Sequence, residues 1–305
     1  MAAKKLLSGS DRLYRTTTKN FDVVECAGCG LMRLDPWPEA EELSRYYPDG
    51  YWWTEGESAA ARLEAWYRRI VLSDHVRFVR RALGRAGGGR VVLDVGCGGG
   101  LFARMLREAG WQAIGLDNSE QAARLAWRGN GVPAVCAMLE ASPVAPGRCA
   151  AVTMFHVLEH LRRPGEYLEQ AREMLAPEGR LVVQVPNAAC WQFLLLGENW
   201  NGLDIPRHLI DFRKKDIEEL LVRCGFEVVA RKQFSLRDNP AGLATSLAPG
   251  LDPMARRLRR VAETAGMRLA KDALYFALVI GSLPFTTIEA TCRAGSTIML
   301  EARKR

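Results

Sequence analysis

The sequence has only four histidines, one closely spaced cysteine pair and no apolar run of membrane-spanning length. Its longest apolar run, Ala273 to Phe285, is shorter than the ~20 residues that a membrane span needs, and Pro284 interrupts it. We expect a buried helix there, or one that lies on a membrane surface. The apolar stretch after Met1 is too short for a signal peptide, and scattered cysteines are typical of a reducing compartment. We therefore expect a cytoplasmic protein without disulfides.

The sequence also lacks any recognisable nucleic-acid-binding motif, although its net charge is +7. Much of the positive charge lies past residue 206, including Arg256, Arg257, Arg259 and Arg260. These arginines form either a solvated helix face or a surface that attracts phosphate, from anionic lipid or a phosphorylated substrate. We expect no nucleic-acid partner.

Short apolar runs alternate with helical segments between residues 90 and 235. The pattern predicts strands at 90–96, 111–117, 133–137, 149–155, 180–186 and 226–234, with a last strand at 296–304. Helices are predicted after Gly100, after Ser119, at 164–175, at 216–224 and across 240–290. This alternation is typical of a doubly wound α/β sheet, which binds ligands at the carboxyl ends of its strands.

A glycine-rich loop follows the first of these strands, in VVLDVGCGGG (91–100). Glycines allow a sharp turn and let a ligand approach main-chain N–H groups. A dinucleotide fingerprint, Gly-x-Gly-x-x-Gly, fails here, because residue 101 is leucine when the count starts at Gly96. Asp117 ends the next strand, where an acidic residue can accept hydrogen bonds from a ribose. Without a ligand, the loop would be a tight turn and Asp117 a helix cap.

Asp94, the glycine loop and Asp117 together resemble the first motifs of class I S-adenosylmethionine-dependent methyltransferases. Residues 151–187, with HVLEH at 156–160 and LAPEGRLVVQVPN, resemble small-molecule enzymes such as the ubiquinone-pathway O-methyltransferases. The resemblance covers about residues 88–235. It implies a Rossmann-like, seven-stranded, mostly parallel sheet with an antiparallel last strand. It also implies S-adenosyl-L-methionine as cofactor.

The resemblance assigns cofactor binding to residues at the ends of four strands. The glycine loop would hold the methionine portion, and Asp117 the ribose hydroxyls. Two positions depart from the family: Cys136-Ala137-Met138-Leu139 stands where an acidic residue often meets adenine, and Cys149-Ala150 replaces Phe-Asp. The full expected set is Asp94, Gly96, Cys97, Gly98, Asp117, Asn118, Met138, Leu139 and Phe155.

The residues after the fourth strand indicate the acceptor chemistry. Methyltransferases that act on base amines usually carry Asn/Asp-Pro-Pro-aromatic there, and this sequence has Phe155-His156-Val157-Leu158 instead. A small-molecule hydroxyl fits better, and its deprotonation favours a general base. We expect His208, then His156, as that base, with Asp204 weaker. The alternatives are a backbone-bonded loop histidine for His208 and a helix-start network for His156, Glu159 and His160.

The N-terminal segment and the segment before the last strand are expected to be additions to the methyltransferase core. Relatives often begin with a zinc ribbon, of which Cys26 and Cys29 match the second half, but Lys5 and Ser8 stand where the first cysteines would fall. Because a structural zinc needs four ligands, we expect a metal-free relic, with ligands from elsewhere or a redox pair as alternatives.

The insertion at 236–295 would be an acceptor lid, a homodimer surface or a peripheral membrane contact. Trp191 and Trp200 would wall the acceptor pocket or pack as a hydrophobic lid.

These observations predict three parts: an N-terminal segment (1–55), the methyltransferase core (56–235 and 296–305) and the helical insertion (236–295). The expected activity is methyl transfer to oxygen on a small-molecule acceptor. Carbon methylation of a nucleotide-linked sugar or lipid-like acceptor is the first alternative. A catalytically silent cofactor-binding subunit is the second.

Overall fold

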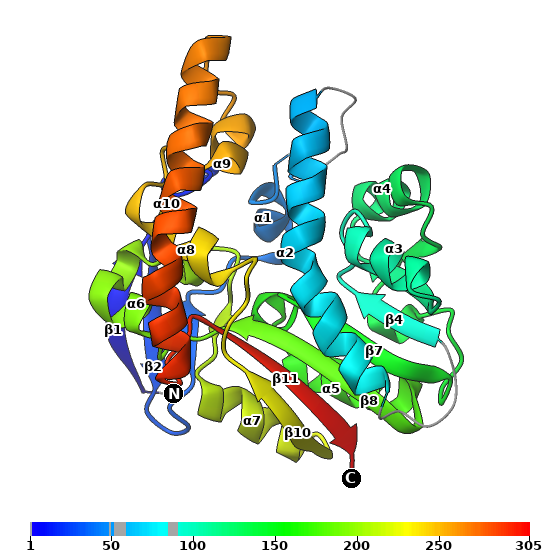
Figure 1. The fold of residues 1–305 in the computed structure, drawn as a ribbon. Coiled ribbons are helices and arrows are strands. Elements are labelled where there is room, and N and C mark those ends of the chain that lie inside the picture. The colour runs from blue at the N-terminus through cyan, green and yellow to red at the C-terminus, as the bar shows by residue number, and fades with distance from the viewer. Residues whose placement is uncertain (1, 49, 52–58, 85–90) are drawn as a thin grey trace.

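The computed structural model describes residues 2–48, 50–51, 59–84 and 91–305, and contains two sheets (Figure 1). The larger sheet has seven strands in the order β10-β11-β8-β7-β4-β5-β6. Neighbours from β6 to β8 pair in parallel, whereas β11 is antiparallel to both β8 and β10. The expected seven-stranded Rossmann-like sheet with an antiparallel last strand is confirmed. Its strands are β4 (Val91–Val95), β5 (Gln112–Asp117), β6 (Ala134–Cys136), β7 (Cys149–Phe155), β8 (Leu175–Pro186), β10 (Phe226–Lys232) and β11 (Thr297–Lys304).

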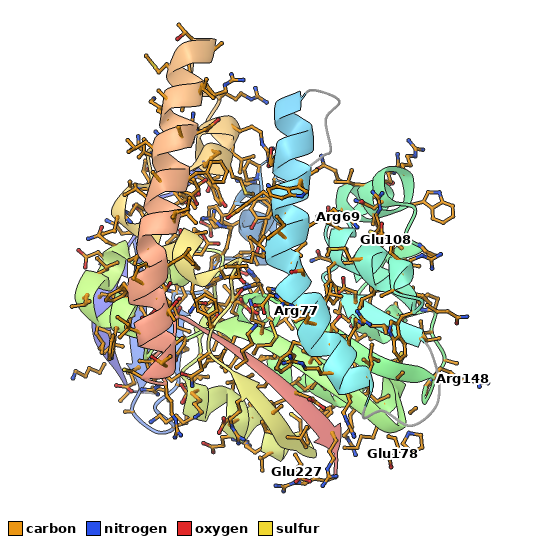
Figure 2. The ribbon with its side chains drawn as sticks, in the orientation of Figure 1. Arg69, Arg77, Glu108, Arg148, Glu178 and Glu227 are labelled. Atoms are coloured by element: carbon orange, nitrogen blue, oxygen red, sulfur yellow. The ribbon has the colours of Figure 1, made fainter. Side chains whose placement is uncertain are left out.

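Helices cover both faces of this sheet because its central strands are apolar on both sides. In β4, Val92 packs in one core with α2 and α3, whereas Leu93 and Val95 pack in the core that includes α5 and α7. Arg69 of α2 pairs with Glu108 of α3, and Figure 2 shows the two side chains pointing toward one another. The helices are α2 (Ala59–Leu83), α3 (Leu101–Glu108), α4 (Glu120–Asn130), α5 (Pro164–Met174) and α7 (Lys214–Arg223).

Between residues 90 and 235 most predicted element boundaries lie within two residues of those observed, with two larger differences, whereas the strands of the N-terminal segment and helix α2 were not predicted. β8 begins at Leu175 rather than at residue 180, because Leu175 pairs with Cys149 before an irregularity in the ladder. The loop expected at 187–212 contains a short helix, α6 (Trp191–Leu196), and a two-residue strand, β9 (Ile210–Asp211). Ser119 caps α4 as predicted, since its side chain accepts a hydrogen bond from the Ala122 N–H.

The N-terminal segment forms a second, four-stranded sheet in the order β1-β2-β3-β9. Strand β9 comes from the loop of the core, and Met32 and Arg33 of β3 pair with it. The segment is thus tied to residues 210–211 by sheet hydrogen bonds. Its predicted boundary with the core, at residues 55–56, lies outside the described residues. Its elements are β1 (Ala3–Gly9), β2 (Phe21–Cys26), β3 (Met32–Asp35) and α1 (Ala40–Arg45).

The insertion forms three helices rather than one continuous stretch: α8 (Asn239–Leu247), α9 (Pro253–Leu258) and α10 (Ala265–Thr291). Ala244 of α8 packs against Tyr275 and Val279 of α10 in a small separate core. The amino-terminal part of α10 extends beyond the sheet, as the upper part of α2 does (Figure 1). Among the described residues, α10 is the one helix long and apolar enough to cross a membrane, by length and composition alone.

Candidate active site

The glycine loop turns the chain from β4 into α3 at the carboxyl edge of the sheet. Gly96 has a φ of 71°, and an added Cβ would lie 2.6 Å from Val157 Cγ2. A side chain is therefore excluded both by backbone conformation and by space. The same contact places the loop directly against the segment between His156 and Glu159. Cofactor loop and histidine segment are thus neighbours.

Asp117 closes the cofactor side of this edge. Its Oδ2 accepts a hydrogen bond from the Gly98 N–H at 2.9 Å, and its Oδ1 accepts one from the Ser119 N–H at 2.9 Å. Burial raises the pKa of Asp117, although those two backbone donors oppose the shift. Asp117 is therefore both the expected helix-start residue and an acceptor at the glycine loop.

Asp94 is a second buried carboxyl group beside the loop. The Thr153 hydroxyl donates to its Oδ1 at 2.7 Å. Burial raises the pKa of Asp94 to about 7, and the nearby Asp117 adds to the shift although the Thr153 hydrogen bond opposes it. Neither carboxylate has an ion-pair partner among the described residues. Two buried acidic groups without a cation fit a ligand that carries positive charge and hydroxyl donors, as S-adenosylmethionine does.

The remaining expected cofactor residues lie at the same edge, at the ends of β4 to β7. Cys97 and Leu139 are buried, whereas Asn118 and Met138 are exposed. Phe155 packs edge-on against His75 of α2 and Phe102 of α3, with ring centroids 5.0 Å apart in both pairs. The topology thus gathers all nine residues, and their individual roles toward the cofactor stay predictions.

All four histidines of the chain lie near the carboxyl end of β7. His75 from α2 packs on Phe155, and its Nε2 lies 3.7 Å from Asp238 Oδ2. The rings of His160 and His208 meet edge to face with centroids 4.7 Å apart. Sequence reasoning singled out the other three histidines, but His75 had no pattern that tied it to them.

His156 follows β7 with a φ of 55°, a left-handed conformation that is uncommon for a non-glycine residue. Its Nδ1 lies 3.0 Å from Glu159 Oε1, and its Nε2 lies 2.8 Å from the side-chain amide of Gln184 and 3.6 Å from Asp238 Oδ1. Burial would lower the pKa of His156, but the Asp238 and Glu159 carboxylates outweigh it and raise the pKa to about 9. A protonated imidazole has no free lone pair. His156 is therefore a charged partner of two carboxylates at neutral pH, and a poorer base than expected.

His208 has the opposite arrangement. Its Nδ1 lies 2.8 Å from the Gly202 carbonyl oxygen, which can only accept, so Nδ1 carries a proton, and in the neutral ring the lone pair is on Nε2. Nε2 lies 4.0 Å from both Glu159 Oε1 and Asp204 Oδ2. The expected backbone hydrogen bond is present, and the role of His208 as a base stays a prediction. Of the two histidines, His208 is the better proton acceptor by geometry.

His160 completes this group. Its Nδ1 lies 3.0 Å from both the Tyr47 hydroxyl and the Arg207 carbonyl oxygen, and because the carbonyl can only accept, Nδ1 carries the proton and Nε2 of the neutral ring has a lone pair. Burial lowers the pKa of His160 to about 4. Donor atoms of Glu159, His160 and His208 lie within 4.8 Å of one another. Glu159 Oε2 is buried without a hydrogen-bond partner among the described residues. Two imidazoles held through Nδ1 and one carboxylate form a donor set that suits a divalent cation. That the chain binds no metal stays a prediction.

A buried ion network holds the loop that carries His208. Arg207 is fully buried, and its guanidinium donates to Asp204 at 2.7 Å and to Asp11 at 3.0 Å. It also donates to the Tyr46 carbonyl and lies 4.5 Å from the centre of the Tyr14 ring. Burial would raise the pKa of Asp204, but Arg207 outweighs it and lowers the pKa to about 2. Asp204 is thus committed to Arg207 and is a weak base. Asp11, Tyr14 and Tyr46 belong to the N-terminal segment, which therefore anchors this loop.

The two tryptophans expected near the acceptor pack within the protein. Trp200 is buried against Phe193, and Trp191 of α6 lies 6.3 Å from Phe285 of α10, measured between ring centroids. They support the hydrophobic-lid alternative. A separate cavity of about 530 Å³ is lined by Lys214, Glu218, Arg231, Lys232, Gln233, Ala290 and Arg293. It contains none of the expected site residues and is not part of this site.

Comparison with known proteins agrees with this geometry. Residues 66–231 match a family model described as a methyltransferase domain. The ubiquinone biosynthesis O-methyltransferase of Pseudomonas paraeruginosa is 31% identical over 139 residues, which are 43% of this chain and 60% of that protein. The protein of the same name from Cereibacter sphaeroides strain KD131 is 27% identical over 168 residues, covering 52% and 67% of the two chains. This chain thus spans about 60% of the length of the first of these relatives.

Solved structures are similar at lower identity. The 1,6-didemethyltoxoflavin-N1-methyltransferase of Burkholderia thailandensis aligns with a TM-score of 0.49 and 17% identity, over 94% of this chain and 96% of that one. The methyltransferase family model covers more than half of this chain, in the region that holds both the glycine loop and the histidine cluster. The chain therefore belongs to the class I S-adenosylmethionine-dependent methyltransferases.

Proposed function

We propose that this protein transfers a methyl group from S-adenosylmethionine to an oxygen atom of a small-molecule acceptor. The observation that carries the proposal is the hydrogen bond from His208 Nδ1 to the Gly202 carbonyl oxygen, which leaves Nε2 as the proton-accepting atom of the neutral ring, 4.0 Å from Glu159 Oε1 and with the His160 ring packed against it. The names of the curated relatives support oxygen as the acceptor atom. S-adenosylmethionine, when bound, would supply a sulfonium methyl group, whose carbon the acceptor oxygen attacks in line while the carbon–sulfur bond breaks and S-adenosylhomocysteine leaves.

Two groups of residues at the carboxyl edge of the sheet would have separate roles, one in binding the cofactor and one in deprotonating the acceptor. Asp117, Asp94 and the glycine loop would hold the cofactor through its ribose and positively charged portion. His208 would accept the proton of the acceptor hydroxyl through Nε2, because Nδ1–H donates to Gly202 O and fixes the ring. Glu159 Oε1 lies 4.0 Å from that Nε2, and the His160 ring packs on the His208 ring. Glu159 and His208 are buried, so the access of water to a reacting oxygen beside them would be limited.

The experiment measures methylation of an acceptor panel by the purified full chain, with product mass as the readout. His208→Asn is the informative variant, since its amide can still donate to Gly202 O while Nε2 is lost. We expect its kcat to fall by roughly 10²-fold or more while S-adenosylhomocysteine binding stays unchanged. An unchanged kcat would remove His208 from the proposal. Absence of turnover on every acceptor, with intact cofactor binding, would favour a catalytically silent subunit.

Repeating the assay with a chelator distinguishes two roles for His208, as a cation ligand or as a proton acceptor. If activity is lost in the presence of chelator and restored by Mg²⁺ or Zn²⁺, His208 acts with Glu159 and His160 as a cation ligand. If activity is unaffected, His208 acts as the proton acceptor. Product analysis by fragmentation distinguishes oxygen from carbon methylation. This experiment does not test three further predictions from the sequence, which are homodimer formation, peripheral membrane contact and a cytoplasmic location.

A further inference from the structure

The outer face of α10 is an apolar surface with nothing packed on it among the described residues. Leu269 and Ile280 are 72% and 66% exposed, and Leu274 and Ile288 are more than half exposed. At 3.6 residues per turn these four lie on one side of the helix. No charged residue occurs between Asp272 and Glu289. Exposed apolar surface of this extent on one helix marks an interaction site.

The opposite side of α10 is fixed to the rest of the protein by polar contacts. Glu289 is buried and accepts hydrogen bonds from the Gln192 N–H at 2.9 Å and from its side-chain amide at 2.8 Å. The Tyr275 hydroxyl lies 3.0 Å from the Thr245 hydroxyl of α8. A helix with a buried glutamate and hydroxyl contacts on one side is held against the protein. It therefore suits a membrane surface rather than a membrane span.

Positive charge gathers at the amino-terminal end of the same helix. Residues 252–272 contain six arginines and lysines against three acidic residues, a net charge of +3. Arg256 and Lys271 are paired with Glu263, and Arg256 also with Asp272. Arg257, Arg260 and Arg268 are exposed and form no salt bridge with any described carboxylate.

We propose that the outer face of α10 docks on an anionic membrane surface, with Leu269, Leu274, Ile280 and Ile288 in the lipid interface. Arg257, Arg260 and Arg268 contact the lipid phosphates at the amino-terminal end of the helix. An anionic bilayer supplies both an apolar layer and negative charge, whereas a second copy of the chain would present the same positive cluster. The carboxyl edge of the sheet would then lie close to the membrane.

The experiment is co-sedimentation of the full chain with vesicles, and it needs no catalytic activity. One set is phosphatidylcholine alone, and the other contains phosphatidylglycerol at about one part in four. Leu269→Glu/Ile280→Glu tests the apolar face. Trp127→Glu/Val222→Glu is the matched control, because it adds the same charge at exposed apolar positions of α4 and α7. Arg257→Gln/Arg260→Gln/Arg268→Gln tests the charge.

We expect the wild type to bind the anionic vesicles, and the apolar-face variant to bind them about tenfold less or weaker still. The control should bind like the wild type. The arginine variant should lose roughly tenfold, mostly as lost preference for phosphatidylglycerol. Circular dichroism and S-adenosylhomocysteine binding verify that each variant is folded.

Three results would overturn the proposal. The wild type could fail to bind either vesicle, or the control could lose binding as much as the apolar-face variant does. The third is a wild-type dimer, seen by light scattering, that Leu269→Glu/Ile280→Glu converts to a monomer without any vesicle binding. That result would assign the face to a second copy of the chain.

Discussion

On the cofactor side, eight of the nine expected residues lie between residues 94 and 139 and follow one another through β4, β5 and β6, whereas the histidine side is assembled from distant segments. His156 and Glu159 follow β7, and His208 comes from the loop before β9. Asp238 comes from the start of the insertion, and Asp11 from the N-terminal segment through Arg207. The cofactor side is made largely of backbone and two carboxyl groups. The histidine side depends on long-range ion pairs.

This difference indicates which side of the site would be affected by changes in the N-terminal segment and the insertion. The cofactor side keeps its contacts within one part of the sheet, such as Gly98 to Asp117. The histidine side needs the N-terminal segment to hold Arg207, although that segment lies far from it in sequence. The N-terminal segment therefore has a structural role at the site whether or not it binds metal.

The largest expected effect is on stability, from Arg207→Met. This change leaves Asp11 and Asp204 buried without their counter-charge, which destabilises the fold by about 3–5 kcal/mol. Urea unfolding followed by circular dichroism measures the difference. Arg69→Met is the control, since its partner Glu108 is on the surface (Figure 2) and the pair contributes at most about 1 kcal/mol. Equal effects for Arg207→Met and Arg69→Met would show that the buried network does not hold this side together.

The next effect is a pH dependence on the cofactor side. The pKa of Asp94 is raised to about 7 in the folded protein, above its ordinary 3.8, so the folded state binds the extra proton between these values. Stability from this group is therefore present below about pH 4 and lost as pH rises through 7, by up to about 4 kcal/mol. Asp94→Asn keeps an acceptor for Thr153 and should remove this loss. The measurement compares unfolding free energies of both proteins, without cofactor, from pH 4 to 8. A wild type and variant that change in parallel would contradict it.

The sequence predicted the cofactor side well because its signals are local. Gly96, Gly98 and Asp117 carry the pattern themselves, and strand order places their ends together. His208 and His156 were also named, in that order, but the contacts that distinguish them as bases were not predicted, because they come from residues distant in the sequence. Asp238 raises the pKa of His156 from a helix start 82 residues away, and Asp11 pairs with Arg207 across 196 residues. A single sequence shows no periodicity or motif that links such residues.

A smaller effect is expected on cofactor affinity, which should depend on the cofactor side of the site and not on the histidine side. Asp117→Ala removes the acceptor for the ribose and releases the Gly98 N–H, so S-adenosylhomocysteine affinity should fall roughly a hundredfold. Isothermal titration calorimetry measures this, with Glu120→Ala, an exposed residue of the next helix, as the control. His208→Asn should bind like the wild type. If His208→Asn also loses the ligand, the two sides are not independent.

The smallest effect is expected at Cys26 and Cys29. Their turn is held by main-chain hydrogen bonds, from Cys26 N–H to Leu31 O at 3.0 Å and from Gly30 N–H to Cys26 O at 2.8 Å. Arg213 adds a hydrogen bond to Glu25 at 2.7 Å, which ties the turn to the start of α7. These contacts do not use the thiols, so Cys26→Ser/Cys29→Ser should change the unfolding free energy by less than about 0.5 kcal/mol. Chelator should leave the thermal midpoint of the wild type unchanged. If chelator lowers that midpoint in the wild type and not in the variant, the thiols hold a metal with ligands from elsewhere, and the segment is not a relic.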